Sequence, residues 1–134
     1  MTVFHREDGT SAVLVRDHVI YVDEPYAKGG MDTGPTATEL FVASLAACAA
    51  DYARRYLAQR GLPAYGLEVT AGFTMTPMTP ARVSSVELRL RPPLRLSDDE
   101  AGGLLAAVEH CTVRDSILDP PRIGMHLEVP AVAA

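Results

Sequence analysis

The stretch DEPYAKGGMDTGPTATELFVASLAAC, residues 23–48, decides the fold of this 134-residue chain. Its first half holds three glycines and two prolines. That composition predicts a loop too long for a simple turn, and long loops in compact domains often carry function. Thr36 and Glu39 then match the S/T-x-x-E capping box directly after a proline, so a helix should begin near Ala37. A glycine and a proline just after position 60 predict its end.

The predicted helix has an apolar stripe and an unusually small-residue centre. Phe41, Leu45, either Cys48 or Ala49, Tyr52 and Tyr56 recur at steps of three and four residues, as one face of a helix requires. Alanines and a serine fill most of the positions around the cysteine. They indicate either good helix propensity alone or a helix buried on most sides, at the centre of a domain or at a subunit contact.

The remaining patterns predict strands and shorter helices. A hairpin is expected from segments 13–15 and 19–22, around a polar break, and two alternating strands from 67–75 and 86–90. Ser97 and Glu100 form a second capping box, which should open a helix that ends near His110. A short helix over 113–118 and a final alternating strand over 123–129 complete the order. Antiparallel strands with helices on one face predict an α+β fold in a single domain, residues 1–134.

Composition and charge exclude several classes of function. Apolar residues make up 48% of the chain, charged residues 22%, and the net charge is −5. An acidic chain lacks the basic footprint of a general nucleic-acid binder. Residues 40–50 are the longest apolar run, well short of the roughly 20 residues that a membrane helix needs. The first ten residues lack the apolar core of a signal peptide. We therefore expect a cytoplasmic protein with neither a nucleic-acid nor a membrane partner.

Two cysteines, Cys48 and Cys111, are the candidates for chemistry. Each is either a small buried side chain or a reactive thiol, because a reducing compartment disfavours structural disulfides. Arg55 lies seven residues after Cys48, nearly at the same helical angle, but reaches the thiol only by folding back. Zinc sites prefer close cysteine pairs, and these two are far apart in sequence. No metal and no cofactor are expected.

The two cysteine motifs together resemble those of the OsmC/Ohr family, the osmotically inducible protein C and organic hydroperoxide resistance proteins. Residues 23–48 are similar to the family's glycine-rich loop and first cysteine helix. The stretch EHCTVRDSILDPP, residues 109–121, is similar to its second cysteine motif, with Thr112 where proline is common. The chain looks closest to the general OsmC-like branch.

This resemblance implies a fold, an assembly and an activity. The fold has antiparallel sheets wrapped around long central helices in an intertwined homodimer. The activity is that of a thiol peroxidase: Cys48 attacks an organic hydroperoxide and becomes a sulfenic acid, and Cys111 then forms a disulfide with it. The resemblance further implies that a dithiol, often a lipoyl one, reduces the disulfide. Apolar surroundings of the thiol would favour alkyl peroxides over hydrogen peroxide.

The chain departs from the hydroperoxidases at the residues that assist the thiol. In those proteins a glutamate ten residues before the cysteine holds an arginine at the thiolate. Here that position is Thr38, and Glu39 lies nine residues before Cys48, which turns the carboxylate by about 100° around the helix. Glu39 therefore either orients an arginine or only caps the helix. Arg6 and Arg16, in the early strand region, are the candidate arginines.

Two alternative functions follow from the same residues. The displaced glutamate and Thr112 are compatible with a non-catalytic OsmC-like dimer whose cleft binds a small apolar ligand. The cysteine pair is also compatible with a redox-sensing dimer, in which oxidation changes a surface that a partner binds.

Overall fold

The long helix predicted after the glycine-rich loop is the central element of the fold. In the computed structural model, which describes residues 1–132, this helix is α1 (Ala37–Gln59). Its capping box is complete: Glu39 N donates to Thr36 Oγ1 at 3.0 Å, and Thr36 N donates to the Glu39 carboxylate at 2.9 Å. The second predicted capping box also forms and opens α2 (Asp98–Glu109). Both helix starts are therefore confirmed.

Two separate antiparallel sheets accompany the helices. The first has the order β1-β2-β3 and the second pairs β4 with β5. Their bounds are β1 (Thr2–His5), β2 (Ser11–Val15), β3 (His18–Val22), β4 (Glu68–Met75) and β5 (Val83–Arg91). The predicted hairpin is confirmed, and Arg16 at its tip takes the left-handed φ of 52° that a tight two-residue hairpin turn needs. The α+β class is confirmed.

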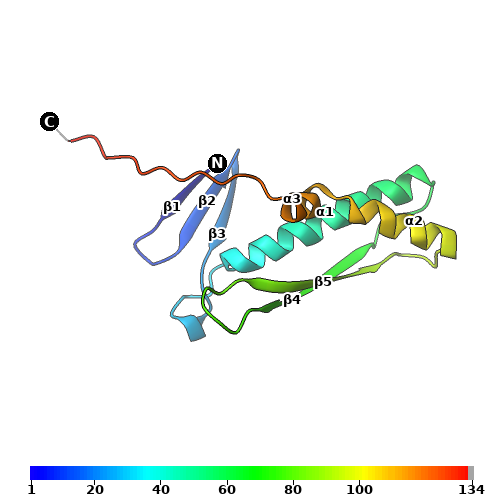
Figure 1. Cartoon of the computed structure of the whole chain (residues 1–134), viewed down its shortest axis with the longest axis horizontal. Helices are drawn as coiled ribbons and strands as arrows, with labels where there is room; N and C mark the ends of the chain where they lie inside the picture. Colours follow the sequence, from blue (N-terminus) through cyan, green and yellow to red (C-terminus); the bar gives the residue numbers. More distant parts are fainter. Residues whose placement is uncertain (133–134) are drawn as a thin grey trace.

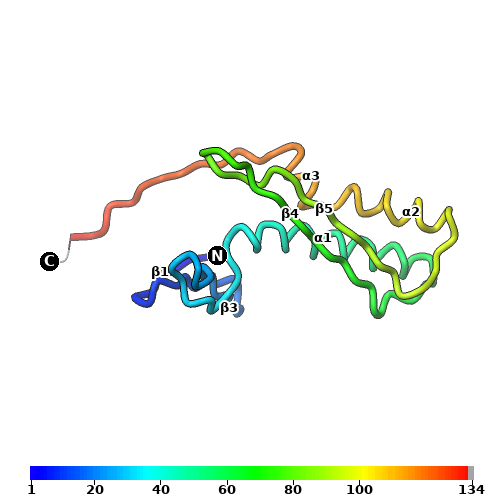
Figure 2. Tube along the Cα trace, turned by 90° about the horizontal axis from the view of Figure 1, so that it is seen from below, coloured from blue at the N-terminus to red at the C-terminus, as the bar shows by residue number. Residues whose placement is uncertain are grey.

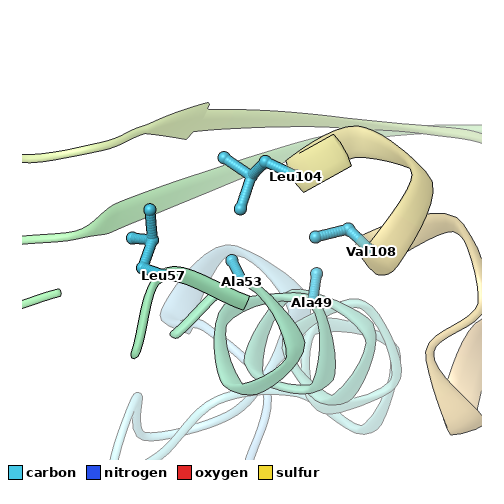
Figure 3. Close-up of a cluster of buried hydrophobic side chains, with 5 residues drawn as sticks. All are labelled: Ala49, Ala53, Leu57, Leu104 and Val108. Atoms are coloured by element: carbon cyan, nitrogen blue, oxygen red, sulfur yellow. The ribbon is translucent and has the colours of Figure 1, made fainter. Parts of the chain in front are cut away.

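The core lies between α1, α2 and the β4–β5 sheet (Figure 1). Side chains from α2 point at the alanines and leucine of α1 (Figure 3); the cluster consists of Ala49, Ala53, Leu57, Leu104 and Val108. Of the predicted stripe, Ala49 is buried as one of its two alternatives required. The rest of the buried face is offset from the prediction by one residue: Phe41 is 43% exposed, and Tyr56 is only partly buried. The reason is that alanine lets α2 approach closely, so the small residues, rather than the large ones, take the centre of the contact.

The three-stranded sheet lies beyond the N-terminal end of α1, away from this core (Figures 1 and 2). Its strands pack chiefly against one another rather than against the helices. Apolar side chains on it are consequently open to solvent; Phe4 is 56% exposed and Val19 is 50% exposed. A sheet with apolar side chains left uncovered in one chain is the kind of surface that marks an interaction site.

The predicted final strand over residues 123–129 was wrong. The short helix α3 (Thr112–Leu118) is followed by prolines, and residues 120–132 take neither helix nor strand conformation. This segment runs away from the helices in both views (Figures 1 and 2). Its apolar side chains are exposed, Leu127 to 95%. A strand forms only against a neighbouring edge, and none within residues 1–132 receives this segment.

Candidate functional site

The fold brings Cys48 and Cys111 together although about 60 residues of chain separate them. Cys48 lies in the middle of α1 and is half-buried, whereas Cys111 is the residue directly before α3 and is 1% exposed. Both thiols are free, and Cys48 is near enough to Cys111 to raise the pKa of the Cys111 thiol. The fold therefore makes the two cysteines neighbours.

The position of Cys111 is fixed by the turn between two helices. Its backbone N–H donates to Val108 O at 3.1 Å, close to the end of α2. Its carbonyl accepts from Asp115 N at 3.0 Å, in the first turn of α3. Because the backbone is bound on both sides, the position of Cys111 between α2 and α3 is fixed.

The environment of Cys111 favours the protonated thiol. Burial raises the pKa of the Cys111 thiol above its usual value, and the neighbouring Cys48 and Asp115 side chains raise it further. A backbone hydrogen bond from Arg114 opposes this shift without overcoming it. Cys111 therefore stays a neutral thiol at pH 7.

A groove of about 420 Å³ opens beside Cys111. Its wall is largely aliphatic, built by Leu45, Val86, Leu88, Leu90, Leu105 and Val108. Charged side chains at the groove are Glu87, Glu109 and Arg114. An aliphatic groove beside a thiol is suited to a small apolar molecule.

Arg114 is a cation near the cysteines that the sequence analysis missed. It lines the groove with Cys111, and its guanidinium donates to Glu109 O at 2.6 Å. The signal that could have found it is spacing, because a residue three positions after a helix start lies over the same face.

Glu39, predicted as either an orienting carboxylate or a cap, acts here as the cap. Its hydrogen bonds from Thr36 hold the pKa of its carboxyl below the usual value. Nine residues along a helix correspond to about 13 Å, so the carboxylate lies far from Cys48 along the axis of α1. The Glu39 carboxylate faces Lys28, in a groove at the N-terminal end of the helix.

Arg6 directly follows β1, and Arg16 lies at the turn between β2 and β3. The sheet of these strands lies beyond the N-terminal end of α1 (Figure 1), whereas Cys48 is in the middle of that helix. Arg6 donates to Thr10 Oγ1 at 3.3 Å and lies 5.4 Å from the centre of the Tyr21 ring. Arg16 is exposed at its hairpin turn.

Arg55, the candidate on the helix of Cys48, is held by another partner. It pairs with Asp51 at 2.6 Å, and its guanidinium lies over the ring of Tyr52, 5.3 Å from the ring centre. It does not fold back to the thiol.

One buried carboxylate, that of Asp23, organises the glycine-rich loop. Asp23 is 7% exposed and accepts hydrogen bonds from the backbone N–H groups of Glu24, Met31 and Thr33 and from the Thr33 hydroxyl. These bonds hold the pKa of its carboxyl below the usual value, with the Thr33 backbone contributing most. A side chain at Gly30 would collide with the Glu24 carbonyl, which explains the glycine there. The loop therefore serves to deliver the chain to α1.

Two further features of residues 1–132 concern metal binding and the membrane. No group of three or more histidine, cysteine, aspartate or glutamate side chains there is placed to hold a metal ion. None of the helices in that range, α1 included, combines the length and apolar character needed to cross a bilayer.

Comparisons with known proteins agree on one family. The family model for OsmC-like protein matches residues 29–126. Comparison with curated proteins gives no match. Among solved structures, a candidate osmotic stress induced and detoxification response protein from Psychrobacter arcticus is similar, with a TM-score of 0.79 and 20% identity over 86% of this chain and 85% of that chain.

Two further structures show the same fold. The OsmC-like protein of Mycoplasma pneumoniae gives a TM-score of 0.73 at 14% identity, covering 89% of this chain and 86% of its own. The organic hydroperoxide resistance protein OhrB of Bacillus subtilis gives 0.62 at 18% identity, covering 86% of each chain. At these identities the likeness concerns the fold.

Proposed function

The chain belongs to the OsmC-like protein family, and from this premise we propose that it is a cytoplasmic Cys-based thiol peroxidase that reduces organic hydroperoxides in oxidative stress defence. The observation that carries the proposal is a pair of neighbouring free thiols, the half-buried Cys48 of α1 and the sealed Cys111 directly before α3, with an aliphatic groove beside Cys111. A groove of this kind would hold the alkyl part of a hydroperoxide and leave its peroxide group at the sulfurs.

The proposed reaction uses the two thiols in turn. The Cys48 thiolate attacks the terminal peroxide oxygen; the O–O bond breaks, Cys48 becomes a sulfenic acid, and the alkoxide takes a proton and leaves as an alcohol. The Cys111 thiol then attacks the Cys48 sulfur, which forms the disulfide and releases water. A small dithiol, such as a lipoyl group, reduces the disulfide and is itself oxidised. The raised pKa of Cys111 fits this order, because a neutral thiol does not compete for the peroxide.

Loss of thiols tests the proposal directly. Mixing the reduced chain with cumene hydroperoxide should consume both thiols, and dihydrolipoamide should restore them over many cycles. The measurement is free thiol by alkylation and mass spectrometry, followed by steady-state consumption of hydroperoxide. Hydrogen peroxide is the matched control and should react more slowly, because it has no alkyl part for the groove. Survival of both thiols in excess hydroperoxide would contradict the proposal.

We further propose that two copies form a homodimer. Three surfaces are open in one chain: the apolar side chains of the first sheet, the small residues Ala43, Ser44 and Ala47 of α1, and the extended segment 121–132. The alternation of Ile123, Met125, Leu127 and Val129 gives that segment one apolar face, which would be covered if it added to a sheet of a second copy.

A pair of substitutions tests this assembly. Leu127→Glu places a charge on the apolar face of the segment, whereas His126→Glu adds a charge on the opposite face. We expect Leu127→Glu to weaken the dimer at least about tenfold, because a charge costs more than 1.4 kcal/mol when it must be buried. His126→Glu should change the dissociation constant little. Sedimentation velocity over a concentration series measures both, and equal behaviour of the two variants would contradict the proposed contact.

A second candidate function is a non-catalytic dimer that binds a small apolar ligand or senses redox state. Two observations favour it: Glu39 caps α1, and Arg6 and Arg16 belong to the N-terminal sheet, away from the helix position of Cys48. Within one chain, Cys48 therefore lacks the assisting carboxylate and arginine. In that case Cys48→Ser should bind an apolar probe in the groove as tightly as the wild type, and hydroperoxides should react no faster than with a free thiol. A redox sensor would instead oxidise once and bind a partner in one state only.

A further inference from the structure

We propose that Tyr52 and Thr112 form a clamp that holds Cys111 against Cys48, and that both are positioning residues for closure of the disulfide. The inference rests on the proposed redox pair and adds two residues that the pair depends on. The carrying observation is a hydrogen bond of 2.8 Å between the Tyr52 and Thr112 hydroxyls.

The clamp connects the immediate surroundings of both cysteines. Tyr52 lies four residues after Cys48, and positions four apart share a face of a helix. Thr112 follows Cys111 directly and is the first residue of α3. Among residues 1–132, this is the only side-chain hydrogen bond between α1 and α3. The bond therefore sets how closely the second cysteine approaches the first.

Each end of the clamp is itself held in place. The ring of Tyr52 lies under the Arg55 guanidinium, and Asp51 fixes that guanidinium at 2.6 Å. At the other end, the Thr112 carbonyl accepts from Ser116 Oγ at 2.7 Å. The Thr112 hydroxyl is not needed as a helix cap, since Cys111 occupies the cap position. Its partner is Tyr52 instead.

Because α3 is short, its position depends on its contacts with α1, including this hydrogen bond. A helix of seven residues is not stable alone, so its position depends on what attaches it to α1. Without the bond, the segment around Cys111 would spend more time away from Cys48. The two sulfurs would then meet less often, and the effective concentration of one thiol at the other would fall.

Disulfide formation in glutathione buffer tests the clamp without any hydroperoxide. Tyr52→Phe and Thr112→Val should each lower the equilibrium constant for the Cys48–Cys111 disulfide by at least about twofold and at most about twelvefold, the range expected for one neutral hydrogen bond. The double variant should lose no more than either single one, because both remove the same bond. Thr112→Ser retains a hydroxyl and should restore the wild-type value. Alkylation of the remaining thiols followed by mass spectrometry gives the constant.

The controls separate positioning from general damage. Tyr26→Phe removes a hydroxyl from a residue that is 73% exposed on the loop before α1, and should leave the constant unchanged. A change below twofold in both single variants, an increase, or no rescue by Thr112→Ser would overturn the clamp. In this buffer the oxidant is glutathione disulfide, which is reduced to two glutathione thiols as the protein disulfide forms. These outcomes therefore do not depend on whether the chain turns over hydroperoxides, and the hydroperoxide assay is an independent test.

Discussion

Cys48→Ser removes hydroperoxide turnover, lowering kcat/KM by at least about 10³-fold, as loss of an attacking nucleophile does in other enzymes. This expectation follows from how accessible each sulfur is to the hydroperoxide. Cys48 is half-buried beside the sealed Cys111, so it is the sulfur that an entering hydroperoxide meets first. A serine hydroxyl has nearly the same size but does not ionise near neutral pH, so the fold should be retained while the reaction is lost. Consumption of cumene hydroperoxide with dihydrolipoamide measures the effect.

Cys111→Ser is the matched variant and should behave differently. Cys48 still attacks the hydroperoxide, so one equivalent is consumed in a burst, but the sulfenic acid has no second thiol to close with. It should accumulate and become trappable by dimedone in this variant and not in the wild type. The proposed roles would be reversed if Cys48→Ser kept its turnover and Cys111→Ser lost the burst. Cys111 would then be the attacking cysteine.

The elements set by local chemistry could be predicted from sequence. Thr36 with Glu39, and Ser97 with Glu100, satisfy the free N–H groups at the helix starts through residues three apart, so the chain segment itself contains the whole signal. The hairpin at Arg16 is equally local. These starts and turns therefore lie where the sequence predicted them.

Features that depend on a distant partner could not be predicted in this way. Apolar residues alternate with others over residues 123–129, as they do in a strand. This alternation predicts which face of a strand would be covered, but not whether the edge of a sheet is available to pair with it. The apolar stripe of α1 was displaced for a similar reason: Ala49 and Ala53 are buried because Leu104 and Val108 of α2 reach them. Nothing within the helix itself distinguishes those two faces.

Some residues of the candidate site could be found from the sequence, and others only from the structure. Two cysteine motifs, at Cys48 and Cys111, were found from a resemblance, and the fold places them side by side. The hydrogen bond between Tyr52 and Thr112 joins residues 60 apart in sequence, and neither has a motif of its own. Arg114 was likewise not predicted at the site, because its position at the groove depends on how α3 packs.

Oxidation to the Cys48–Cys111 disulfide should raise the free energy of unfolding by about 4 kcal/mol. The bond closes a loop of about 60 residues, and the chain-entropy model gives that value for the restriction of the unfolded chain. Little native distortion should offset the gain, because the thiols are already neighbours and α3 is held to α1 on the far side of Cys111. Guanidinium unfolding of the oxidised and reduced forms, at one protein concentration, measures the difference.

The matched control for this effect is Cys111→Ser treated with the same oxidant. It contains no second thiol to close the loop, so its oxidised and reduced forms should unfold at the same guanidinium midpoint. The slope of unfolding should fall on oxidation in the wild type alone, since a cross-linked unfolded chain exposes less surface. Equal or lower stability of the oxidised wild type would mean that closing the disulfide pulls α3 out of its position on α1. That result would contradict the arrangement in which Cys111 lies ready for Cys48, and it would count against the clamp and the peroxidase cycle together.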